Sequence, residues 1–150
     1  MSPLAQIIHN PAIICMFIAW NLAQLLKILV QYMVFHRWDW SLFFSAGGMP
    51  SSHSALISAT AISIGLFYGF DTAAFTIALA TAMIVIYDAA GVRRQAGVHA
   101  EKINIIISEL FSGQPISEEH LKEMIGHTPR QVLVGTTLGI LIAVLVRLVW

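Results

Sequence analysis

Two histidines, several fixed cations and a group of serines stand in segments that border apolar runs. The segment GGMPSSHSA, at residues 47–55, contains three serines and His53, and GVRRQAGVH, at residues 91–99, contains two arginines and His99. Imidazole can attack phosphorus or protonate a leaving alkoxide near neutral pH. Arginine forks, hydroxyls and the first amides of a helix bind phosphoryl oxygens. These residue types indicate a site for a phosphate ester that works without a metal.

The composition predicts an integral membrane protein. Of the 150 residues, 57% are hydrophobic and 11% are charged, whereas soluble proteins average about 45–50% and about 25%. The formal net charge is zero, so no overall field attracts nucleic acid, and we expect no such partner. The length predicts one domain, residues 1–150. Cys15, the single cysteine, lies in an apolar run, where we expect it to pack.

Four apolar segments predict an all-α membrane bundle with about four transmembrane helices. They run from Pro11 to Phe35, His53 to Phe70, Thr72 to Ala90 and Gln131 to Trp150. A bilayer core needs about 20 helical residues, but a shorter helix inside a bundle can be accommodated by thinning of the bilayer.

The charged stretch between the third and fourth segments predicts two further helices. Residues 92–111 place apolar side chains at helical spacing opposite polar ones, which is typical of an amphipathic helix that packs on a bundle or lies at the membrane interface. Gly113-Gln114-Pro115 then ends this helix. Ser117, followed by acidic residues, predicts the cap of a short surface helix that ends at Gly126.

The distribution of charge predicts the orientation. With four spans, the segments near 36–52 and 91–130 share one side of the membrane. Six of the eight Lys and Arg residues fall on that side: Arg37, Arg93, Arg94, Lys102, Lys122 and Arg130. The positive-inside rule makes this side cytoplasmic. We therefore expect a bacterial inner-membrane protein whose site faces the cytoplasm, with Lys27 about two turns from that end of the first helix.

The motifs and their order resemble a known family. Pro50-Ser51-Ser52-His53 resembles the P-S-G-H motif of the type 2 phosphatidic acid phosphatase superfamily, which comprises lipid phosphatases related to vanadium haloperoxidases. Arg93 and His99 have the spacing of its R-x5-H motif, and Lys27 and Arg37 could represent its K-x6-R-P motif. With YDAAGVRRQAG and the later GHTP, essentially the whole chain resembles the divergent branch of that superfamily.

The resemblance implies a lipid phosphate or pyrophosphate phosphatase that needs no cofactor. His99 would be the nucleophile that forms a phosphohistidine intermediate, and His53 would protonate the leaving oxygen. The residues expected to bind the phosphoryl group are Lys27, Arg37, Ser51, Ser52, Arg93 and Arg94. The expected partners are the lipid phosphate substrate and membrane lipids, and a homodimer would bury the packing glycines.

Three departures from the family motifs keep a second interpretation open. Ser52 replaces the glycine of P-S-G-H, Trp38 stands where the first motif has proline, and Ile103 occupies the position of the aspartate four residues after the nucleophile. Without that carboxylate the imidazole loses its orienting partner, although Asp88, Glu101 or Asn104 could replace it. The alternative is a noncatalytic phospholipid-binding, phosphate-binding or transport protein, and a third interpretation is a structural membrane subunit.

Several of these residues also have simpler interpretations. Lys27 could snorkel to the interface. Arg93-Arg94 could be a positive-inside anchor, and Asp88 could pair with either arginine. His127-Thr128-Pro129 predicts a helix cap before the fourth span, so His127 is left out of catalysis. The chain has no H-E-x-x-H or C-x-x-C motif, and we predict no metal centre.

Overall fold

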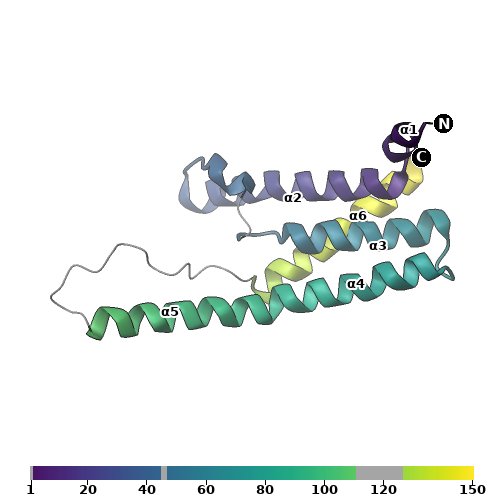
Figure 1. The fold of residues 1–150 in the computed structure, drawn as a ribbon. Coiled ribbons are helices and arrows are strands. Elements are labelled where there is room, and N and C mark those ends of the chain that lie inside the picture. Colours follow the sequence, from purple (N-terminus) through teal and green to yellow (C-terminus); the bar gives the residue numbers. More distant parts are fainter. Residues whose placement is uncertain (1, 45–46, 111–126) are drawn as a thin grey trace.

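The computed structural model describes residues 2–44, 47–110 and 127–150, and every regular element in those ranges is helical (Figure 1). The elements are α1 (Pro3–Ile8), α2 (Pro11–Phe35), the 3-10 helix η1 (Trp40–Phe44), α3 (Ser52–Tyr68), α4 (Ala73–Ala90), α5 (Val92–Leu110) and α6 (Pro129–Val149). The predicted all-α class is confirmed. The predicted surface helix from Ser117 to Gly126 lies outside the described residues.

Side-chain caps set most helix starts. Asn10 Oδ1 accepts the amides of Ala12 and Ile13 at 3.0 and 3.3 Å, so α2 begins at the predicted Pro11. Ser51, Thr72 and Thr128 cap α3, α4 and α6 in the same way. These polar caps satisfy amides that have no acceptor within their own helix.

The central helix of the bundle is α3, which contacts α2, α4 and α6. Its buried residues are all serine, alanine or glycine. Gly139 of α6 packs against the Ala55 carbonyl and the Ser58 hydroxyl of α3, with no room for a side chain. Small residues let helices approach closely in a membrane, where polar hydroxyls can bond across the contact. Ser58 Oγ accordingly lies 3.1 Å from the Thr136 carbonyl.

Within the described residues, three helices are long and apolar enough to cross a membrane: α2, the run from Ala73 to Ile107, and α6. The second predicted span, α3, is apolar but has 17 residues. Because three other helices surround α3, its short length exposes little polar backbone to lipid. Large apolar side chains such as Leu25, Ile77 and Leu141 point outward, as a lipid-facing surface requires. The chain is a membrane protein.

Figure 1 shows which ends of the helices meet. The ends of α2 and α4 and the starts of α3 and α6 lie at one end of the bundle, which we call the motif end. Both termini and the turn between α3 and α4 lie at the other end. The prediction that the GGMPSSHSA segment and the end of the third span share one side is therefore confirmed.

Two features go beyond what the sequence predicted: the placement of α5, for which packing on the bundle and a position at the interface were both open, and two short helices. α5 continues α4 beyond the bundle, and among the described elements it contacts only α4 (Figure 1). The sequence analysis did not predict α1 or η1. η1 packs on α2, where the rings of Phe43 and Trp20 meet edge to face with centroids 5.8 Å apart.

Candidate functional site

A buried lysine meets the start of the central helix. Lys27 Nζ donates a hydrogen bond of 3.2 Å to Ser52 Oγ, and the two residues are only 2% and 1% exposed. Lys27 lies eight residues before the last residue of α2, or about 12 Å along the axis at about 1.5 Å per residue. Its side chain points into the bundle and does not snorkel outward. The cation is thus held inside the protein, below the end of α2.

The chain that enters α3 brings backbone and hydroxyl groups beside this cation. Gly48 has a φ of +89°, and a Cβ at this position would lie 3.7 Å from Lys27 Cδ. Ser51 Oγ accepts a bond from the Ser54 amide at 3.3 Å and lies 3.0 Å from the Ser54 hydroxyl. Ser51 and Ser54 are fully buried. The amides of a first helical turn carry positive partial charge, so this arrangement can bind an anion together with Lys27.

The start of α6 is tied to the same segment. The Ser51 amide donates to the Gln131 carbonyl at 3.1 Å, and Gly135 packs against the backbone of Ser51. Thr128 and Gln131 form a reciprocal capping box, in which the Thr128 amide donates to Gln131 Oε1 at 2.9 Å. The predicted Thr128 cap is confirmed.

His127 is buried at this junction. It is 3% exposed, its amide donates to the Ala89 carbonyl at 3.2 Å, and its Nδ1 lies 3.3 Å from Gln131 Oε1. The sequence analysis missed Gln131. The signal was present, because Thr128 followed three residues later by Gln131 is the pattern of a capping box.

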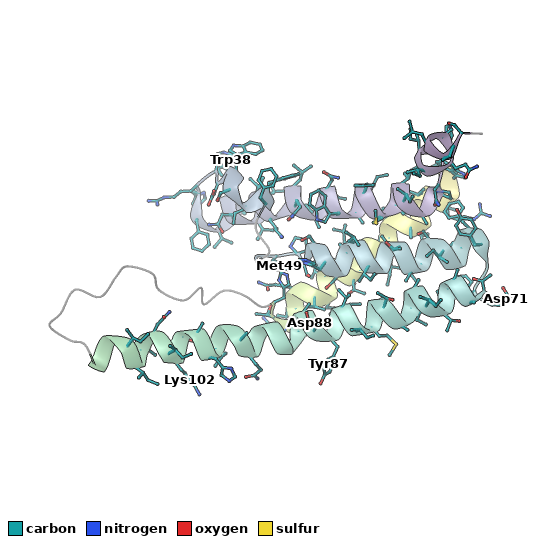
Figure 2. All side chains as sticks on the ribbon, in the orientation of Figure 1. Trp38, Met49, Asp71, Tyr87, Asp88 and Lys102 are labelled. Atoms are coloured by element: carbon teal, nitrogen blue, oxygen red, sulfur yellow. The ribbon has the colours of Figure 1, made fainter. Side chains whose placement is uncertain are left out.

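Four further predicted site residues lie on other parts of the structure: Arg37, His53, Asp88 and His99. His53 is exposed in the first turn of α3, and Arg37 is exposed after the end of α2. Asp88 is half-buried near the end of α4, at the same end of the bundle as Met49 (Figure 2). His99 is exposed on α5, and the described elements bring only α4 into contact with that helix.

The backbones of Arg93 and Arg94 lie in the first turn of α5, and their side chains are outside the described part of the structure. Of the residues that could replace the missing aspartate, Glu101 is exposed and Asn104 is buried. Ile103 itself is exposed. Lys27, Ser51 and Ser52 are thus the predicted residues that the structure brings together.

No three His, Cys, Asp or Glu side chains within residues 2–44, 47–110 and 127–150 are grouped so that they could hold a metal ion. The groups that the described centre does bring together are donors: the Lys27 ammonium group, serine hydroxyls and the amides at the start of α3. Such groups stabilise negative charge on phosphoryl oxygens.

Comparison with known proteins agrees with the motifs. The divergent PAP2 family matches residues 8–142. The chain is also similar to a Bacillus subtilis (strain 168) protein named "Uncharacterized membrane protein YuiD", with 37% identity over 131 residues, covering 80% of this chain and 83% of the relative. No solved structure matches the chain. Because the family match spans most of the sequence, the chain belongs to the divergent PAP2 family.

Proposed function

We propose that the protein is a metal-independent phosphatase that removes phosphate from a lipid phosphomonoester or pyrophosphate. The hydrogen bond between Lys27 and Ser52 carries this proposal. A lysine inside a membrane helix is costly and is by default a sign of function. Here it is directed at the hydroxyl and the helix start of a motif that resembles a phosphate-binding motif.

The phosphoryl group would replace Ser52 as the main partner of Lys27. Its oxygens would then also accept bonds from the hydroxyls of Ser51 and Ser52 and from amides at the start of α3. Arg37, Arg93 and Arg94 are the further cations that the resemblance supplies. Phosphoryl transfer depends mainly on such positioning and charge stabilisation, so donors without a metal are sufficient for this chemistry.

The covalent steps use two imidazoles. One ring nitrogen attacks phosphorus while the ester P–O bond breaks, and the leaving alkoxide takes a proton from His53. Water then attacks the phosphohistidine, the P–N bond breaks, and His53 takes the proton from that water. The family resemblance assigns the nucleophile to His99. That assignment stays a prediction.

The substrate's apolar chain would remain among the helices or in the surrounding lipid. The excess of Lys and Arg at the motif end supports a cytoplasmic placement of the headgroup in a bacterial inner membrane. Phosphatidic acid, phosphatidylglycerophosphate and isoprenyl phosphates all fit this description.

The test is phosphate release by the purified protein in detergent from each of those three lipid classes. We expect release from at least one of them, and loss of release in His53→Ala with lipid binding retained. Failure of a folded preparation to release phosphate from every lipid would overturn the proposal. Binding of those lipids without release would instead favour the noncatalytic binder, which Ile103 in place of the expected aspartate also favours.

A further inference from the structure

A cavity of about 390 Å³ lies among α2, α3 and α4, away from the motif end. Residues from all three helices border it: Ile13 and Met16 of α2, Ile64 of α3, Ala74 of α4, and Asn10 and Tyr68 at helix ends. Its volume is within the range of about 300–1,000 Å³ that is typical of small-molecule sites. The Tyr68 hydroxyl donates to Asn10 Oδ1 at 3.2 Å. Since Asn10 precedes α2 and Tyr68 ends α3, this polar pair lies at the end of the cavity farthest from the motif end.

The packing of the bundle explains this cavity. Both α2 and α4 contact α3, but among the described elements they do not contact each other. Figure 1 shows α3 between these two helices. Side chains of α3 such as Thr60 and Ile64 therefore border a space that neither neighbour fills. Apolar cavities stay dry, so a hydrocarbon chain suits this space better than water does.

One face of α2 connects the cavity with Lys27. The row on this face comprises Ile13, Met16, Trp20, Gln24 and Lys27. Its members are separated by steps of three or four residues, which place side chains on the same face of a helix. Ile13 and Met16 border the cavity, whereas Lys27 is bonded to Ser52. The row is thus polar at Lys27 and Gln24 and apolar at the cavity.

A row on α3 connects the same two places. It comprises Ser52, Leu56, Thr60, Ile64 and Tyr68. Each member follows the previous one by four residues, the spacing that forms a ridge along a helix. The first residue of the row is bonded to Lys27, and the last three border the cavity. At about 1.5 Å per residue, Met16 lies about 16 Å from Lys27 along α2, and Asn10 lies about 25 Å from it.

We infer that these two rows bind the apolar chain of the substrate and that the cavity receives its last carbons, because both rows begin at the Lys27–Ser52 hydrogen bond and end at the cavity. A molecule with a phosphate at one end and hydrocarbon at the other matches the change from polar to apolar residues along α2. The inference rests on the proposed function and deepens it, because it names the kind of chain that the substrate carries.

The positions of the two rows also give the length of that chain. An extended chain of single bonds advances about 1.2 Å per bond, as an extended peptide does over the bonds of each residue. About 14 bonds therefore reach from Lys27 to Met16, and about 20 reach to Asn10. The polar Asn10–Tyr68 pair ends the apolar path. The substrate class is thus a lipid phosphate with a fatty chain of about 14–20 carbons, whereas a much longer isoprenyl chain would have to leave the cavity past that pair.

Photo-crosslinking of the native chain locates the hydrocarbon directly. The purified protein is mixed with hexadecyl phosphate that carries a diazirine near its last carbon, illuminated, digested and mapped by mass spectrometry. We expect adducts on the peptides that contain Met16 and Ile64. Adducts mainly on outward residues of α6 such as Leu141, or an equal yield in the cavity from hexadecanol with the same diazirine, would overturn the inference. Adducts in the cavity that depend on the phosphate, without phosphate release from any lipid, would overturn the proposed function and leave the chain in this groove as that of a bound ligand.

A variant that fills the cavity provides a second readout. Met16→Trp should lower kcat/KM for hexadecyl phosphate by about tenfold or more, because the larger side chain excludes the last carbons. It should leave kcat/KM for octyl phosphate within about twofold, since that chain ends before Met16. Leu141→Trp, at an exposed position on α6, is the control and should leave both values unchanged. Equal loss for the two substrates, or no loss for either, in a folded Met16→Trp protein would contradict the inference.

Discussion

Gly135 of α6 packs directly against the backbone carbonyl of Ser51, at the start of α3, with no room for a side chain. The contact lets the Ser51 amide reach the Gln131 carbonyl at 3.1 Å. The approach of two helices thus positions the residues that the proposed site uses.

The first prediction follows from this contact. Gly135→Val should destabilise the folded protein by about 1–3 kcal/mol or more, because rigid backbone stands where the new side chain must go. Thermal unfolding in detergent measures the effect. Thr137→Val, at an exposed position two residues away on α6, is the matched control and should leave the melting temperature nearly unchanged. Equal stability of the two variants would mean that α6 does not pack on Ser51 in this way.

The second prediction is that replacing Lys27 lowers activity without lowering stability. Lys27→Met keeps much of the stem and removes a buried charge, so the melting temperature should stay the same or rise. Hydrolysis of lipid phosphate should fall by about 10²–10³-fold, as loss of one donor to a developing charge does. Lys102→Met is the control, because this lysine is exposed on α5 away from the bundle (Figure 2). Hydrolysis that survives Lys27→Met would remove Lys27 from the site.

Much of the fold could be predicted because its causes are local. Asn10 followed by Pro11 and a long apolar run determines where α2 begins, and the structure places α2 at the predicted residues. Four apolar segments that cross the membrane in turn were sufficient to predict that PSSH and the end of the third span lie on the same side. The resemblance also selected Lys27 and Ser52, which meet although 25 positions separate them.

The third prediction concerns the cap of α6. Thr128→Ala removes the side-chain oxygen that caps the helix and should cost about 1 kcal/mol of unfolding free energy. Thr128→Ser keeps that oxygen and should cost much less. Unfolding in a denaturing detergent, followed by circular dichroism, compares the two. If both variants unfold together with the native protein, the capping box contributes no stability.

What the sequence could not reveal depends on contacts between distant elements. Thr128-Pro129 correctly predicted a cap, but burial of His127 requires the end of α4 beside it, and only the fold supplies the Ala89 carbonyl. The direction of α5 is similar: an amphipathic pattern predicts a helix and an apolar face, yet it cannot tell whether that face packs on the bundle. Gln131 shows both kinds of contact. Its capping box with Thr128 is local, whereas the bond from the Ser51 amide to its carbonyl requires α6 to pack on α3.

The fourth prediction tests the orientation in the membrane. Cys15 is the single cysteine and is fully buried, so an introduced cysteine can be labelled with little background. In intact bacterial cells a membrane-impermeant maleimide should label Asp71→Cys, which lies at the end opposite the motif end (Figure 2). Lys102→Cys should react only after permeabilisation. The reverse pattern would place the proposed site outside the cytoplasm.

The last prediction concerns a glutamine one turn from the lysine. Gln24 is 4% exposed, and its Oε1 is the one buried side-chain oxygen or nitrogen without a hydrogen-bond partner among the described residues. A buried polar atom without a partner costs about 1–3 kcal/mol, so Gln24→Leu should stabilise the protein by about 1 kcal/mol. Gln31→Leu, at a half-buried position on the same helix, should change stability by less than about 0.5 kcal/mol. Thermal unfolding of both variants compares them. A loss of stability in Gln24→Leu would show that this amide has a partner in the membrane, such as a water molecule beside the Lys27 ammonium group.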